Sequence, residues 1–86
     1  MYRILIKKSA EKEMDRLSAA MKRRIAGALG ELSENPRARG AVKLQGSDDL
    51  WRIRVGDYRV VYAVEEDRLL VLVVRVAHRR DVYRGM

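Results

Sequence analysis

The sequence predicts an α+β domain in which an N-terminal strand, a helical hairpin and a three-stranded antiparallel meander form a four-stranded sheet. Two observations support this fold class. Apolar residues recur with helical spacing in the first half of the chain, and they alternate with polar residues around a two-residue turn in the second half. A chain of 86 residues accommodates one such domain, which we expect to cover residues 1–86.

The first half begins with a strand and continues into two helices. Residues 2–6 alternate and are rich in β-formers, which predicts a strand. Ser9 fits the N-cap position of a short helix that follows. A second helix is predicted over Ala19–Glu34, where Asn35-Pro36 ends it. Its apolar stripe consists of Met21, Ile25, Ala28, Leu29 and Leu32.

The second half reads as three strands that follow a loop over residues 37–49. Leu50–Val55 and residues 58–64 alternate, and Gly56-Asp57 between them is a two-residue hairpin turn. Residues 69–76 are apolar on both faces, which indicates an interior strand. An interior strand needs a second neighbour, and the N-terminal strand is the remaining candidate.

The hairpin turn also predicts which residues lie opposite one another. A two-residue turn pairs Arg54 with Arg59 and places Arg52 on the same face. Like charges directly opposite repel, so three arginines on one face stabilise a sheet poorly but suit phosphate binding. In the alternative interpretation they extend into solvent or pair with carboxylates, for which the candidates are Asp48, Asp49 and Asp57.

The charge of the chain points to a polyanionic partner. Nineteen Lys and Arg against twelve Asp and Glu give a net charge of +7, which predicts nucleic acid, an acidic protein or anionic lipid as partner. We expect a cytoplasmic protein with no membrane association, because no apolar run approaches the roughly 20 residues of a spanning helix and the first residues return quickly to charge. Cysteine is absent and His78 is the single histidine, so we expect no metal site and no cofactor.

Three segments together resemble one known family. They are similar to the RelE branch of the RelE/ParE toxin superfamily and cover residues 43–46, 50–62 and 78–83. The end of the helical hairpin, at residues 34–37, is similar as well. The resemblance implies a toxin of a type II toxin–antitoxin pair, with a cognate antitoxin protein as partner. It also implies an endoribonuclease that enters the ribosome and cuts messenger RNA in the A site. The RNA's own 2′-hydroxyl attacks the adjacent phosphate, and no metal takes part. In this family the antitoxin usually binds DNA, so no sequence-specific DNA binding is expected from this chain.

The resemblance also assigns candidate catalytic residues by position. The two basic residues of the second strand fall on Arg52 and Arg54, and the arginine after the hairpin turn falls on Arg59. The arginine after the last strand falls most naturally on Arg79, with Arg80 as the alternative because this segment is shorter here, and the C-terminal tyrosine falls on Tyr83. The secondary candidates, for RNA binding or catalysis, are Lys43, His78 and Arg80.

The general base stays open at this level. A strand lysine crowded by cations can lose its proton, whereas the arginine at position 54 cannot. His78 or Tyr83 could accept the proton, or the enzyme could rely on positioning and charge stabilisation. In the alternative interpretation without catalysis, His78 is a surface residue without a role, and the Tyr83 ring covers the edge of the core.

Two other functions are compatible with the same fold. One is a ParE-like toxin that inhibits DNA gyrase, a branch that typically lacks the full set of basic residues with the tyrosine. The other is a non-catalytic domain that binds an antitoxin or nucleic acid. The combination of Arg52, Arg54, Arg59, Arg79 and Tyr83 favours the ribonuclease.

Overall fold

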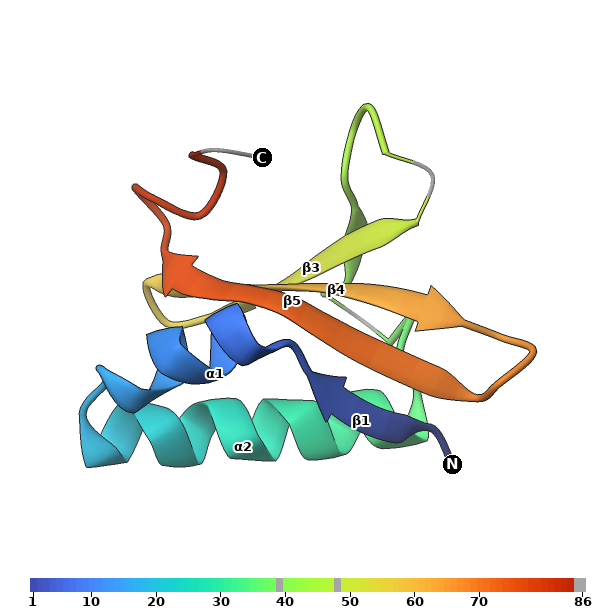
Figure 1. Ribbon diagram of the computed structural model, residues 1–86, viewed down its shortest axis with the longest axis horizontal. Helices are drawn as coiled ribbons and strands as arrows, with labels where there is room; N and C mark the ends of the chain where they lie inside the picture. Colours follow the sequence, from blue (N-terminus) through green and yellow to red (C-terminus); the bar gives the residue numbers. More distant parts are fainter. Residues whose placement is uncertain (39, 48, 85–86) are drawn as a thin grey trace.

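The computed structural model describes residues 1–38, 40–47 and 49–84, which form two helices and a five-stranded sheet (Figure 1). The sheet has the order β1-β5-β4-β3-β2, with β1 parallel to β5 and the other neighbours antiparallel. The elements in chain order are β1 (Arg3–Ile6), α1 (Lys8–Asp15), α2 (Ala19–Glu34), β2 (Val42–Lys43), β3 (Leu50–Val55), β4 (Tyr58–Glu65) and β5 (Leu70–His78).

The predicted fold class is confirmed, with one additional strand. The interior strand β5 does pair with the N-terminal strand on its free edge. The fifth strand, β2, has two exposed residues and pairs with Trp51 and Arg52 of β3. A strand this short has no detectable alternation, so the predicted count of four strands was too low.

The helix ends differ from the predictions at one position. Ser18 caps α2 by accepting a hydrogen bond from the Met21 N–H at 3.1 Å, and α2 ends at Glu34 as predicted. Ser9, however, lies inside α1, and the expected N-cap there was wrong. Lys7 is the residue directly before α1, and its N–H still donates to the Val73 carbonyl of β5 at 2.8 Å. The chain therefore passes from β1 into α1 without a loop.

Both helices cover one face of the sheet, and the core lies between them and the strands (Figure 1). Ile25, Leu29 and Leu32 of α2 pack in one core with Val60 and Tyr62 of β4 and Val71, Val73 and Val76 of β5. The Tyr62 ring is fully buried, and its hydroxyl donates to the Pro36 carbonyl at 2.6 Å. Burial raises the pKa of Tyr62 to about 12. This bond ties the end of α2 to the sheet.

The β3–β4 turn is tight and is overlaid by a basic side chain. Gly56 has a φ of +59°, which suits the first central position of a type II′ hairpin turn. A Cβ at Gly56 would lie 2.9 Å from Nη1 of Arg24 on α2. Glycine is required here by the positive φ of the turn, and it also leaves room for the Arg24 guanidinium, although that flexible side chain could move aside.

A β-bulge sets the faces of the end of β5. The partner of Tyr62 is Val73 and the partner of Val61 is Arg75, so Val74 is an extra residue on β5. Simple alternation from Val73 would direct Arg75 to the core. The bulge instead places Arg75 on the face that the helices leave uncovered.

None of the helices in the described part of the chain is long and apolar enough to span a membrane.

Candidate functional site

The β3–β4 hairpin places three arginines on the sheet face opposite the helices. Arg54 pairs directly with Arg59, and Arg52 pairs with Val61, as the hairpin turn predicted. Trp51 and Ile53 alternate with these residues and pack against the core on the other face. The register therefore concentrates positive charge on one side of the sheet and apolar surface on the other.

Arg59 is the most enclosed of these arginines, with 9% of its surface exposed. Its Nη1 donates to the carbonyls of Gly56 and Tyr58, at 3.2 and 3.0 Å. Main-chain acceptors thus orient the guanidinium without neutralising it. Among the residues that the structure describes, no carboxylate lies within ion-pair distance of the arginines at positions 52, 54, 59 and 79.

The pKa of Arg59 reports what surrounds it. Burial lowers this pKa, and the positive charges of Arg54, Arg52 and Arg79 lower it further, while Tyr83 acts in the opposite direction. Arginine stays protonated in proteins, so the strain of like charges is not relieved by loss of a proton. A bound anion relieves it instead. The four other predicted catalytic residues all lie close enough to Arg59 to affect its titration.

Arg79 and Tyr83 belong to the segment Arg79–Arg84, hereafter the C-terminal segment, which rises from the end of β5 on the side opposite the helices (Figure 1). The Arg79 N–H donates to the Asp57 carbonyl at 2.7 Å, which holds the start of the segment beside the hairpin turn. The N–H groups of Asp81 and Val82 then donate to the His78 carbonyl, at 2.8 and 3.0 Å. The side chain of Val82 is fully buried, although it lies outside the main core.

A cleft of about 580 Å³ lies between the C-terminal segment and the loop that joins β2 to β3. Figure 1 shows both of these segments rising from the same face of the sheet. Lys43 and Arg52 contribute positive charge to the cleft, and Tyr83, 48% exposed, contributes an accessible ring. The cleft is lined by Val42, Lys43, Leu44, Gln45, Gly46, Ser47, Leu50, Arg52 and Tyr83. A concave surface with cations and an exposed aromatic ring suits a single nucleic-acid strand.

His78 lies apart from the arginines. It pairs with Tyr58, whose ring it meets edge-on at 5.6 Å between centroids, and Tyr58 faces the helix side of the sheet. Its Nδ1 accepts a hydrogen bond from the Arg80 N–H at 3.2 Å. The His78 ring is therefore on the other face of the sheet from Arg54 and Arg59. The side chain of Arg80 is exposed.

The alternative partners of the arginines are not engaged in the described residues. Asp49 and Asp57 are exposed and form no ion pair there. The third candidate, Asp48, lies outside the described residues.

Sequence reasoning missed Arg75, which lies in one cross-strand row with Arg52 and Val61. Its position in an apolar run suggested no role, although a lone charge in such a run is itself a signal. The bulge that places Arg75 on the open face has no sequence signature comparable to a turn.

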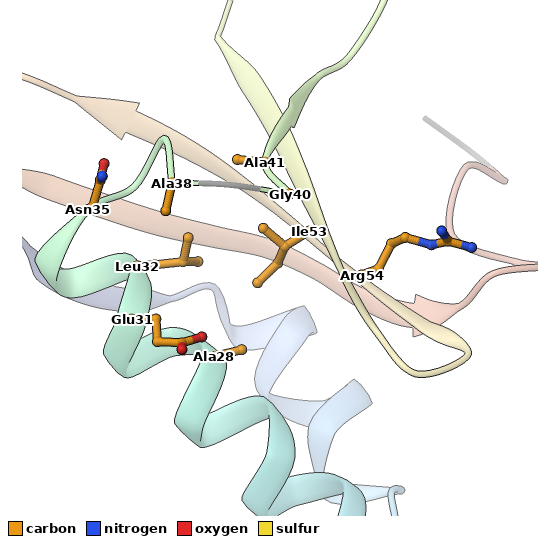
Figure 2. A pocket seen from close by; sticks show the side chains of 9 residues that line it. All are labelled: Ala28, Glu31, Leu32, Asn35, Ala38, Gly40, Ala41, Ile53 and Arg54. Carbon is orange, nitrogen blue, oxygen red and sulfur yellow. The ribbon is translucent and has the colours of Figure 1, made fainter.

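A second cavity, of about 170 Å³, lies between α2 and β3 (Figure 2). Leu32 and Ile53 point into it, and Arg54 extends away from it (Figure 2). Its lining is mainly apolar, and the polar residues at its edge are Glu31, Asn35 and Arg54. Within the described ranges, no three His, Cys, Asp or Glu side chains gather in a way that could hold a metal ion.

Comparison with known proteins places this geometry in context. The sequence pattern described as "ParE toxin of type II toxin-antitoxin system, parDE" matches residues 4–83. The chain is 32% identical to Toxin RelE of Mycobacterium tuberculosis, over 96% of this chain and 87% of that protein. It is 33% identical to the mRNA interferase toxin RelE of Escherichia coli K12, over 86% of this chain and 81% of that protein. Among solved structures, the archaeal RelE–RelB complex from Pyrococcus horikoshii aligns with a TM-score of 0.82 and 31% identity, over 94% of this chain and 98% of that one.

Proposed function

Because the chain belongs to the ParE family of type II toxin–antitoxin toxins, on its RelE branch, we propose that it is an endoribonuclease that cuts messenger RNA in the ribosomal A site. The observation that carries the proposal is the convergence of Arg52, Arg54, Arg79 and Tyr83 around the enclosed charge of Arg59, which has no carboxylate partner among the described residues. The likeness to a relative named as an mRNA interferase supports RNA as the substrate.

In the proposed reaction, the 2′-hydroxyl oxygen of one nucleotide attacks the adjacent phosphorus. The P–O5′ bond breaks, which leaves a 2′,3′-cyclic phosphate and a 5′-hydroxyl. Negative charge builds on the phosphate oxygens in the transition state, and preorganised guanidinium groups stabilise it. Arg59, with Arg52 beside it on the same face, supplies this stabilisation without a metal ion.

Arg79 and Tyr83 have the remaining roles. Arg79 is held beside the hairpin turn by its main-chain bond to Asp57, and we assign its side chain to the departing 5′-oxygen. Tyr83 stacks on a base in the cleft and so aligns the 2′-hydroxyl with the phosphate. Lys43 and Arg80 contact the RNA backbone as exposed cations.

The proposal gives His78 no part in the chemistry, because its ring lies with Tyr58 on the helix side of the sheet. Arg54 cannot act as a base, since arginine keeps its proton. Positioning and charge stabilisation then determine the rate. Water in the open cleft takes the proton of the 2′-hydroxyl and supplies the proton that the departing 5′-oxygen needs, while Arg79 stabilises the charge on that oxygen.

We further propose that a cognate antitoxin inhibits this chain by covering the arginine face. The likeness to a RelE crystallised with RelB supports an antitoxin as partner. The net charge of +7 and the arginines without a carboxylate partner among the described residues predict an acidic inhibitory segment.

The test is a reconstituted translation reaction in which the 5′ ends of the message are mapped by primer extension, with naked RNA beside it. Cuts within A-site codons on translated message alone support the proposal. Cuts on naked RNA would support a nuclease activity but would show that it does not depend on the ribosome. Growth arrest with no cuts, and with inhibited DNA supercoiling in a gyrase assay, would replace it with a ParE-like activity. Neither cuts nor arrest would leave a non-catalytic binding domain.

A further inference from the structure

Arg75 connects the C-terminal segment to the helical layer. It starts on the open face, opposite Val61, and its Nη1 donates to the main-chain carbonyl of Arg84. Its Nε lies 3.4 Å from Oε2 of Glu13 on α1. Because the Arg84 carbonyl is one residue after Tyr83, this side chain holds the main chain directly beside the ring.

Glu13 is itself held in place by the edge of the sheet. β1 ends at Ile6, opposite Val73, so the following part of β5 has no strand on that side. Oε1 of Glu13 accepts from the Val76 N–H at 2.9 Å and replaces the missing strand partner. The same carboxylate thus satisfies the main chain through one oxygen and faces Arg75 through the other. Arg75 and Glu13 are both about three-quarters buried, with 22% and 27% of their side chains exposed.

The contact between them is a charge interaction rather than a well-formed hydrogen bond. Within the described residues, the Nε–H of Arg75 is buried without an aligned acceptor. A partly buried guanidinium gains more from a nearby carboxylate than a fully solvated one does. The arrangement is therefore sensitive to the charge of Glu13 and not only to its acceptor oxygen.

We propose that Arg75, oriented by Glu13, is a positioning residue that holds the C-terminal segment and thereby sets the place of Tyr83 in the cleft. The segment has few other fixed points in the described chain: the buried side chain of Val82 and the main-chain bonds near its start. At its end, the Arg84 N–H donates to the Asp81 carbonyl at 3.0 Å within the segment itself, and the exposed ion pair Arg84–Asp81 at 3.5 Å contributes little.

The catalytic part of this inference rests on the proposed ribonuclease function, so the test has two independent readouts. The first is hydrogen exchange of the free protein, which needs no RNA. Arg75→Met removes the donors and the charge but keeps most of the aliphatic chain, and Glu13→Gln keeps the acceptor for Val76 while removing the charge. In both variants, the amide hydrogens of Asp81, Val82 and Arg84 should exchange faster than in the wild type. Arg68→Met, which removes an exposed arginine in the β4–β5 turn, is the matched control and should not.

The second readout is cleavage kinetics in the wild-type and Tyr83→Ala backgrounds. In the first background, Arg75→Met should lower kcat by about tenfold with little change in KM, as expected when a reacting geometry is misplaced. In the second background, the same change should have almost no effect, because both variants remove one function. An equal loss in both backgrounds would overturn the positioning role.

Unchanged exchange of the segment in Glu13→Gln and in every folded Arg75 variant would overturn the proposal as well. If Arg75→Met does not fold, hydrogen exchange of Glu13→Gln still tests the proposal. If the wild-type protein cuts no RNA, the proposed function fails, and hydrogen exchange still decides whether Arg75 holds the segment.

Discussion

Arg54 and Arg59 face each other directly across the β3–β4 hairpin, where sheets usually place opposite charges or apolar pairs. The structure offers neither of them a carboxylate among its described residues. This pairing reduces the stability of the hairpin and raises its affinity for anions. Conflict between local stability and charge placement is expected at functional sites.

The first prediction concerns Arg54. Arg54→Glu should stabilise the protein by about 0.2–1 kcal/mol, the usual range for an opposite-charge cross-strand pair. It should also abolish cleavage, because a carboxylate then occupies the phosphate-binding face. Thermal melts and the primer-extension assay measure the two effects. The matched control is Arg52→Glu, which faces Val61 rather than Arg59 and has a smaller effect on the Arg59 charge, so it should gain less stability. A loss of stability in Arg54→Glu would show that the two arginines do not repel.

The second prediction separates charge from geometry at Arg59. Arg59→Lys keeps one positive charge but loses the planar fork and at least one of the two bonds to the carbonyls of Gly56 and Tyr58. Cleavage should fall by about a hundredfold, as for loss of one preorganised donor. Single-turnover rates test this, and Arg68→Lys is the control for exposed arginines. A folded Arg59→Lys enzyme with the wild-type rate would contradict the assigned role.

The third prediction concerns the ring of Tyr83. Tyr83→Phe keeps the stacking surface and should retain most of the activity, whereas Tyr83→Ala should lose at least about tenfold, the effect of one lost base stack. Binding of RNA should change less than kcat, because the ring orients the base rather than neutralising a phosphate. If Tyr83→Phe is as defective as Tyr83→Ala, the hydroxyl and not the ring is the important group.

The fourth prediction concerns His78. His78→Asn retains an acceptor near the position of Nδ1, so the bond from the Arg80 N–H should persist. The pH–rate profile should match that of the wild type, because the His78 ring lies on the helix side of the sheet. Loss of one limb of the profile in the Asn variant would make His78 a proton-transfer group.

The fifth prediction concerns a contact far from the arginine face. Glu66 accepts a hydrogen bond from the Tyr2 hydroxyl at 2.6 Å and pairs with Arg37. The bond from Tyr2, with that from Arg37, lowers the pKa of Glu66 below its ordinary value of 4.5. A lowered folded-state pKa contributes stability above 4.5, and this contribution is lost as the pH falls through the lower value.

Glu66→Gln should therefore reduce the acid-side fall in Tm while leaving cleavage at neutral pH unchanged. The measurement is Tm as a function of pH for both proteins. Glu65→Gln on the same strand end, where the carboxylate faces the exposed Arg68 at 3.5 Å, is the matched control. If Tm falls equally with decreasing pH in the wild type and in Glu66→Gln, the Glu66 contact does not contribute to stability.

The parts of the fold that local chemistry determines were predictable. The Gly56-Asp57 turn determines the pairing of β3 with β4, and the same pairing brings Arg52, Arg54 and Arg59 to one face. The parts that depend on distant contacts were not. Arg75 acts through Glu13 on another element, and the face of His78 depends on a bulge opposite Val61. Neither relationship produces a periodic pattern in the sequence from which it could be predicted.

The pairing of β1 with β5 has a consequence for how the molecule is made. β1 finds its neighbour in the sheet only after Leu70–Val73 has been synthesised, and Tyr83 follows later still. Contacts so distant in sequence form late, because the whole intervening chain must first be closed into a loop. During translation, the arginines of β3 and β4 emerge before the strand and the segment that complete their surroundings. The cleft is therefore complete only after the residues up to Tyr83 have been synthesised and have folded back onto the sheet.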